Sequence, residues 1–215
     1  MCLGILQISE HWLGAGGRIT FLGWKGNGMP IKLPEWWIAR EIPFIENDWR
    51  NIQLYCKDPE TPWKWKDAIY LIRLSPPFAI RYSDERPSPL IYVGSGAVQQ
   101  RWSSHRWWLE RLGYYLPGAR YEVWISHHPE FKRVEADALF LFQQDKKRLP
   151  LMNRRAESGS RGNEHDYDKD YYGAFVEADR RYVWSMEPFQ KDVLEYFDKG
   201  KFEEPLPGFD EKSIA

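Results

Sequence analysis

Three short blocks of apolar residues in the middle of the chain predict β-strands. The first block, at residues 68–74, consists mostly of β-branched and aromatic residues, which is typical of a buried strand. A second block of this kind covers 90–94, and a third, in which apolar and polar residues alternate, covers 121–126. These blocks predict a sheet of three strands.

Apolar positions spaced three or four residues apart predict two helices. The first covers 97–115 and is ended by Gly113 and the prolyl-glycine pair beyond it. One face of this helix carries Arg101, His105, Trp108 and Leu112. The second helix has about fifteen residues, follows Pro129, has Glu135 near its N-terminal end and stops before Pro150. The order β-β-α-β-α predicts an α/β (α+β) fold in which helices flank a small sheet.

The flanks of this central region are less regular. The first sixty residues are rich in glycine and tryptophan, with a strand predicted at 18–24 and a short helix, opened by Pro34, at 34–40. A polar stretch with two prolines at 57–62 indicates a boundary. The predicted organisation is an N-terminal extension at 1–60, a core at 61–160 and an acidic, aromatic C-terminal extension at 161–215. Most of the twelve tryptophans are interpreted as packing residues, with a stacking platform for bases as the alternative.

The charge of the chain is balanced overall but uneven along its length. Thirty Lys and Arg face 31 Asp and Glu, so a globally basic nucleic-acid binder is excluded. Residues 146–161, however, contain six Lys or Arg and one Glu, whereas residues from 164 onward contain fourteen acidic and seven basic residues. Such a division can place an anion-binding face on a neutral protein; a solvated mixed surface is the simpler interpretation.

Composition also favours a cytoplasmic protein. The chain has 215 residues, enough to bury a sizeable core, and no apolar stretch long enough to span a membrane. Its N-terminus lacks the basic start of a signal peptide. Two cysteines, Cys2 and Cys56, do not support a disulfide framework, so we expect a reducing compartment.

Six residues placed on these predicted elements form a specific series. They are Tyr70 in Ala68-Ile69-Tyr70, Tyr92 in Tyr92-Val93-Gly94, Arg101, His105, Glu135 and Asn153. The series resembles the motifs of the GIY-YIG nucleases over about residues 67–156. The resemblance implies a GIY-YIG-like core and a divalent-metal-dependent endonuclease that hydrolyses DNA, with RNA left open. Two departures are Ala68 in place of the family's glycine and the 22 positions between the tyrosines, which imply an enlarged hairpin at 76–89.

Each member of the series suits phosphodiester hydrolysis, which needs a base, a cation at the phosphate and help for the leaving oxyanion. Arg101 and His105 share a helix face, where a guanidinium can clamp phosphate and an imidazole can relay a proton. A single carboxylate supplemented by water suits Mg²⁺ or Mn²⁺. The resemblance makes Glu135 the metal ligand and Tyr70 the general base or its partner. A phenol has a pKa of about 10, so a tyrosine base is expected to need a cation, a histidine or the metal to lower it.

The remaining roles complete the prediction. Tyr92 supplies a second hydroxyl, and Asn153 braces the site. The basic segment is predicted to contact the DNA backbone through Lys146, Lys147, Arg148, Arg154 and Arg155. A recognition sequence with two-fold symmetry would require a homodimer.

Two other functions stay open at this point. The first is a catalytically inactive nucleic-acid or protein interaction module on the same core. The second is a tryptophan-rich ligand-binding protein in which the motif series is a coincidence. The positions of two side chains test the second alternative, because a structure in which Glu135 and Tyr70 face different sides of the sheet would decide for it.

Overall fold

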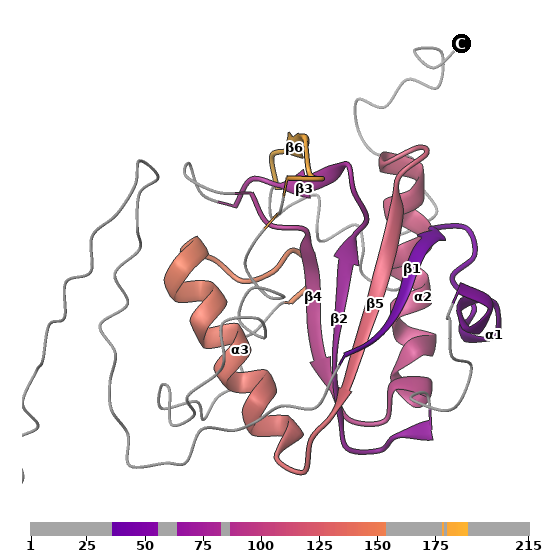
Figure 1. Ribbon diagram of the computed structural model, residues 1–215, viewed down its shortest axis with the longest axis vertical. Coiled ribbons are helices and arrows are strands. Elements are labelled where there is room, and N and C mark those ends of the chain that lie inside the picture. The colour runs from indigo at the N-terminus through magenta and orange to yellow at the C-terminus, as the bar shows by residue number, and fades with distance from the viewer. Residues whose placement is uncertain (1–35, 56–63, 83–86, 154–177, 179, 189–215) are drawn as a thin grey trace, which may run out of the picture.

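The fold is built on an antiparallel sheet of four strands (Figure 1). The computed structural model describes residues 36–55, 64–82, 87–153, 178 and 180–188. Across the sheet the strands are β1 (Trp37–Pro43), β5 (Arg120–His127), β2 (Ala68–Leu74) and β4 (Leu90–Ser95). All three pairings are antiparallel. The protein is therefore of mixed α and β class.

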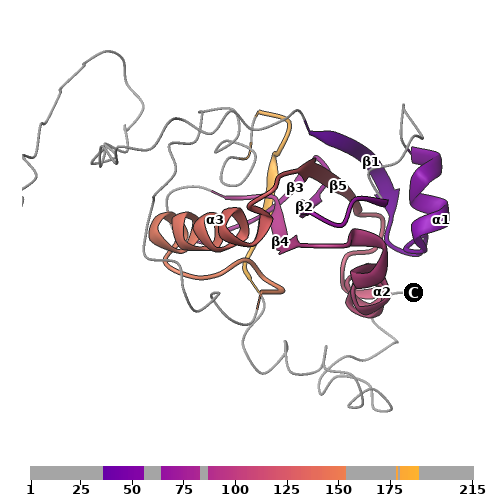
Figure 2. The same cartoon turned by 90° about the horizontal axis from the view of Figure 1, so that it is seen from below.

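Two long helices cover the two faces of this sheet. Helix α2 (Val98–Tyr115) lies on one face and α3 (Phe131–Lys146) lies on the other (Figure 2). Every residue of β2 is buried, as expected for a central strand with a helix on each side. The three predicted strands and both predicted helices are confirmed, with bounds that differ by one or two residues.

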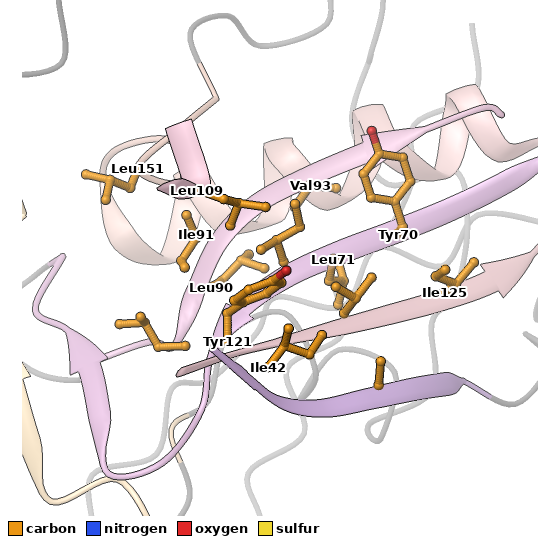
Figure 3. Close-up of a cluster of buried hydrophobic side chains, with 14 of the residues drawn as sticks. Ile42, Tyr70, Leu71, Leu90, Ile91, Val93, Leu109, Tyr121, Ile125 and Leu151 are labelled. Atoms are coloured by element: carbon orange, nitrogen blue, oxygen red, sulfur yellow. The ribbon is translucent and has the colours of Figure 1, made fainter. Parts of the chain in front are cut away.

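The core lies mainly between the sheet and these helices (Figure 3). Leu71, Val93, Leu109 and Ile125 are completely buried there. Truncating a buried leucine or isoleucine to alanine costs about 2–5 kcal/mol, so this contact holds the helices in place against the sheet. Trp102 adds a specific link, because its indole N–H donates to the carbonyl of Asn47 at 2.6 Å.

The predicted helix at 34–40 is wrong, because this segment contributes strand β1. Residues Trp37 and Ile38 pair with Ile125 and Trp124 of β5, whose other edge pairs with β2. Without β1, the backbone of β5 would be unpaired on one side. A bulge near Glu41, where φ is 56°, shifts the register by one residue between Ala39 and Ile42. The prediction of three strands is therefore one too few, since the sheet includes a strand from the segment predicted as an N-terminal extension.

Smaller elements occupy the connections. Helix α1 (Trp49–Ile52) is capped by the Asp48 side chain and continues into a 3₁₀ turn, η1 (Gln53–Tyr55). The long connection between the two tyrosines contains β3 (Phe78–Ile80), which pairs in parallel with β6 (Trp184–Met186). The predicted strand at 18–24 lies outside the described residues. No helix in the described part of the chain is long and apolar enough to cross a bilayer.

Candidate active site

A buried hydrogen bond between Tyr70 and His105 is the centre of the candidate site. Strand β2 presents Tyr70 to the face covered by α2, and His105 lies on the inner face of that helix. The Tyr70 hydroxyl and Nε2 of His105 are 2.6 Å apart. Tyr70 is completely buried and His105 is 4% exposed. Strand β2 and helix α2 therefore bring these two residues of the motif series into contact.

Aromatic rings enclose the imidazole of His105. Its ring centroid lies 4.6 Å from that of Tyr92, 5.5 Å from Trp108 and 5.7 Å from Trp102. Burial, and to a lesser degree the positive charge of Arg101, lowers the pKa of His105 to about 3. The imidazole is consequently neutral near pH 7 and has one ring nitrogen available as an acceptor.

The phenol of Tyr70 is also neutral. Its pKa is raised well above 10, first by burial and then by the nearby Tyr92 hydroxyl and the charge of Glu135, whereas Arg101 lowers it. As expected, a nearby cation, Arg101, lowers the pKa of Tyr70. Burial raises this pKa by more, so the net shift is upward. Tyr70 therefore keeps its proton, and the tautomer of the imidazole decides whether the phenol or Nε2 of His105 donates in the bond between them.

Gly94 allows the two tyrosines to lie close to the backbone of β4. Tyr70 pairs with Gly94 across the sheet, and Tyr92 pairs with Ile72 on the same face. A Cβ atom on Gly94 would lie 2.6 Å from both Cζ and Oη of Tyr70, and 2.6 Å from Cε1 of Tyr92. The glycine is thus needed for space. Ala68, which stands where the GIY-YIG motif has glycine, causes no backbone strain. Among the described residues other than glycine, only Glu41 and Lys147 have positive φ angles.

Glu135 enters the site from α3, in the second turn of that helix. Its carboxylate is nearly buried, with 9% of the residue exposed, and Oε2 accepts a hydrogen bond of 2.5 Å from the hydroxyl of Ser95. Ser95 is the last residue of β4 and is itself buried. The sequence analysis missed Ser95, although its place directly after Tyr92-Val93-Gly94 was a usable signal.

Tyr70 and Glu135 belong to opposite faces of the sheet and lie against successive residues of β4. The register places Tyr70 and Gly94 on the α2 face, and Ile69 and Ser95 on the α3 face. The Tyr70 hydroxyl nevertheless lies over Gly94, while the Glu135 carboxylate bonds to the next residue, Ser95. The effect of Glu135 on the pKa of Tyr70 shows that the two groups interact electrostatically. Tyr70 and Glu135 thus approach β4 from opposite sides of the sheet, at the successive residues Gly94 and Ser95, and this is the arrangement expected for a coincidental motif series.

Asn153 holds the outer edge of β4. Its side-chain oxygen accepts from the N–H of Val93 at 2.9 Å, and its amide nitrogen donates to the carbonyl of Val93 at 2.8 Å. The neighbouring N–H of Met152 donates to the carbonyl of Ile91. Both ends of the Asn153 amide are therefore engaged by the strand that carries Tyr92 and Gly94.

The basic residues predicted to contact phosphate differ in their exposure. Arg101 is exposed in the first turn of α2, and its charge acts on both Tyr70 and His105. Lys146, in contrast, is buried, and its ammonium forms an ion pair of 2.9 Å with Asp145, so it does not face solvent as a phosphate contact would.

The rest of the predicted basic segment lies at the C-terminal end of α3 or beyond it. Lys147 is exposed and donates to the carbonyl of Gln144. The guanidinium of Arg148 lies 5.9 Å from the ring centroid of Tyr82. Arg154 and Arg155 lie outside the described residues.

A metal at this site would rest on few protein ligands. Among the described residues, no group of three or more His, Cys, Asp or Glu side chains is placed to hold an ion. One carboxylate oxygen donor, Glu135, fits Mg²⁺ or Mn²⁺, which retain several water ligands and bind substrate phosphate. No family model, curated protein or solved structure matches the chain. The resemblance to GIY-YIG nucleases therefore rests on the motif series alone.

Proposed function

We propose that the protein is a divalent-metal-dependent endonuclease that hydrolyses phosphodiester bonds in DNA, with a GIY-YIG-like core. The observation that carries this proposal is the buried Tyr70–His105 hydrogen bond of 2.6 Å, located where Arg101 and Glu135 both act on the phenol. The arginine belongs to α2 and the carboxylate to α3, so charges from two helices influence the same tyrosine.

The two neutral groups permit a proton relay that never forms a buried phenolate. The phenol oxygen of Tyr70 takes a proton from the attacking water while its own proton passes to Nε2 of His105. The water oxygen bonds to phosphorus as the bond to the leaving oxygen breaks. Arg101 binds the phosphate, which adds negative charge beside His105 and favours its protonation in the transition state.

Glu135 would hold the metal, with its carboxylate oriented by Ser95. A bound Mg²⁺ or Mn²⁺ supplies charge neutralisation at the phosphate and at the leaving oxyanion. Tyr92 contacts both Tyr70 and His105 through its ring, which fixes their orientation. Asn153 acts on the site through β4.

One observation favours the alternative of an inactive interaction module. Tyr70 is completely buried and its pKa is raised, so its hydroxyl meets water only if substrate or metal opens the site. In that case the same residues would form a rigid polar core, and nucleic acid or a protein partner would bind without being cut.

Cleavage assays separate these functions. Purified protein is incubated with plasmid and genomic DNA in Mg²⁺ or Mn²⁺, beside Glu135→Gln and the control Glu110→Gln, which changes an exposed carboxylate on α2. We expect metal-dependent cutting by the wild type and the control, and a loss of at least about 100-fold in Glu135→Gln. Equal DNA binding by all three proteins without cutting would instead establish the interaction module.

A further inference from the structure

The candidate site lies near the end of the sheet where β2 begins and β4 ends. Here the N–H of Gly96 donates to the carbonyl of Ala68 at 2.7 Å. The ring of Phe131, the first residue of α3, comes within 3.9 Å of the Cβ position of Gly96. The start of α3 therefore adjoins the end of β4, next to Ser95, which donates to the Glu135 carboxylate.

A second segment joins the same surface from the start of β2. The ring centroid of Trp65 lies 5.8 Å from that of His127, at the end of β5. The N–H of His128 donates to the carbonyl of Asp67 at 2.9 Å. Residues 64–67 and the first turn of α3 are consequently held side by side through the end of β5.

These two segments surround the end of the sheet with exposed positive charge. We define the cationic rim as Lys64, Lys66, Lys132 and Arg133, all of which are exposed. Asp67 and Glu130 are the acidic residues within the same two segments, so the rim keeps an excess of two positive charges. Pro129 and the residues up to Arg133 line an open hollow beside it.

The rim lies closer to Glu135 than the basic segment that the sequence indicates. Lys132 and Arg133 are within one helical turn of Glu135 along α3. Lys146 and its neighbours begin eleven residues further on, which corresponds to about 16 Å of helix. A strand whose scissile phosphate lies at Glu135 would meet the cations of the rim first.

We propose that the cationic rim binds the phosphate backbone of the substrate strand beside the scissile bond. This inference rests on the proposed function, because it takes the end of β4 as the place of cleavage. Lysine and arginine at such positions neutralise phosphates and release counterions, and each contact adds about 0.9 to the slope of log affinity against log salt. The rim sets affinity and register on the strand and leaves sequence choice to other residues.

The test measures DNA binding in the full-length Glu135→Gln protein, so that cleavage does not intervene. The rim variant is Lys132→Ala with Arg133→Ala. Its control is Arg40→Ala with Arg50→Ala, which removes the same charge from exposed positions on β1 and α1. Affinity for a labelled 30-base-pair duplex is titrated from about 50 to 200 mM salt. We expect the slope of the rim variant to fall by about 2 and its affinity near 0.1 M salt to fall about tenfold or more, with the control unchanged.

Equal slopes for the rim variant and the control would overturn the inference. Lys64→Ala with Lys66→Ala tests it on the second segment, should the first rim variant fail to fold by circular dichroism. The results also distinguish a failure of the cationic rim from a failure of the proposed nuclease function. Cleavage by the wild type with unaltered binding by both rim variants rejects the rim and keeps the nuclease, whereas rim-dependent binding without any cleavage rejects the nuclease and keeps the rim as a nucleic-acid contact.

Discussion

Gly94 sets the distance between the two tyrosines and the backbone of β4, so a larger side chain at this position would displace a tyrosine ring. In Gly94→Ala the added methyl group would lie 2.6 Å from atoms of Tyr70 and Tyr92, so one ring must move. We expect a loss of about 1–3 kcal/mol in the free energy of unfolding, measured by urea denaturation. The displaced Tyr70 should also lose its bond to His105. Unchanged stability would mean that the rings rearrange freely, and the site would then lack the rigidity assigned to it.

Ser95 offers a test of how Glu135 is held. Removing its hydroxyl in Ser95→Ala leaves Oε2 of Glu135 without that donor, and partners of a ligating carboxylate commonly affect metal affinity by 10–100-fold. We expect Mn²⁺ to bind at least about tenfold more weakly, measured by electron paramagnetic resonance in the absence of DNA. Ser88→Ala is the matched control, because Ser88 is equally buried but bonds to the backbone of Leu90. The same loss in both variants would argue for a general effect on folding.

For single residues, the sequence indicated which side chains suit the chemistry, but it did not determine which residues of different elements pack against one another. Tyr70, Tyr92, Arg101 and His105 could be selected because they resemble the GIY-YIG motif series, and the helical spacing of Arg101 and His105 also suits phosphate chemistry. The importance of Ser95 depends on which α3 residue packs against the end of β4, and periodicity alone does not fix that contact. The direction of the pKa of Tyr70 was equally hidden, because it depends on how completely the phenol is buried.

The edge of β4 gives a prediction for one element. Asn153→Ala deletes the two hydrogen bonds to Val93, leaving a backbone donor and acceptor to find other partners. We expect a loss of about 1–3 kcal/mol in stability and faster hydrogen exchange at the Val93 amide, measured by NMR. Asn51→Ala, at an exposed position of α1, should change neither quantity. Protection of Val93 that survives in Asn153→Ala would show that other residues hold this edge.

The helices and strands were predicted correctly where the apolar residues follow a single period, either that of a strand or that of a helix. Strand β2 and helix α3 have uninterrupted apolar patterns, and their bounds follow from those patterns. Strand β1 was misread because a proline and paired tryptophans resemble a helix start, while its true conformation is imposed by the unpaired edge of β5. Long-range pairing of this kind overrides local propensity.

The whole molecule depends on the segment that precedes the predicted core. A chain that starts at residue 61 would lose β1, which covers one edge of β5, and the Asn47 carbonyl that accepts from Trp102. We expect this truncated protein to lose its cooperative thermal transition and its near-ultraviolet circular dichroism. Arg40→Ser, an exposed change on β1, is expected to keep both. A cooperative transition in the truncated chain would show that residues 61 onward fold alone.

Stability of the whole molecule should also depend on pH through His105. Its pKa is about 3 in the folded protein and about 6.5 when unfolded, so only the unfolded chain takes up this proton between those values. Stability from this group is complete above pH 6.5 and falls as pH decreases, by about 2 kcal/mol between pH 7 and pH 5. Denaturation at both pH values should show this extra loss in the wild type and in His127→Gln, but not in His105→Gln. Equal pH dependence in all three proteins would place a charged or solvated imidazole at position 105.

The contacts of Met152 and Asn153 have a further consequence for how copies of the protein can meet. An open strand at the border of a sheet is a template on which another chain can add, and this is a common route to aggregation. On β4 the outward carbonyl of Ile91 and both backbone groups of Val93 are already occupied by residues of the same chain. A visiting strand would have to displace them before it could pair there. Contacts between copies on this side must therefore be made by side chains, which a point substitution can weaken without unravelling the sheet.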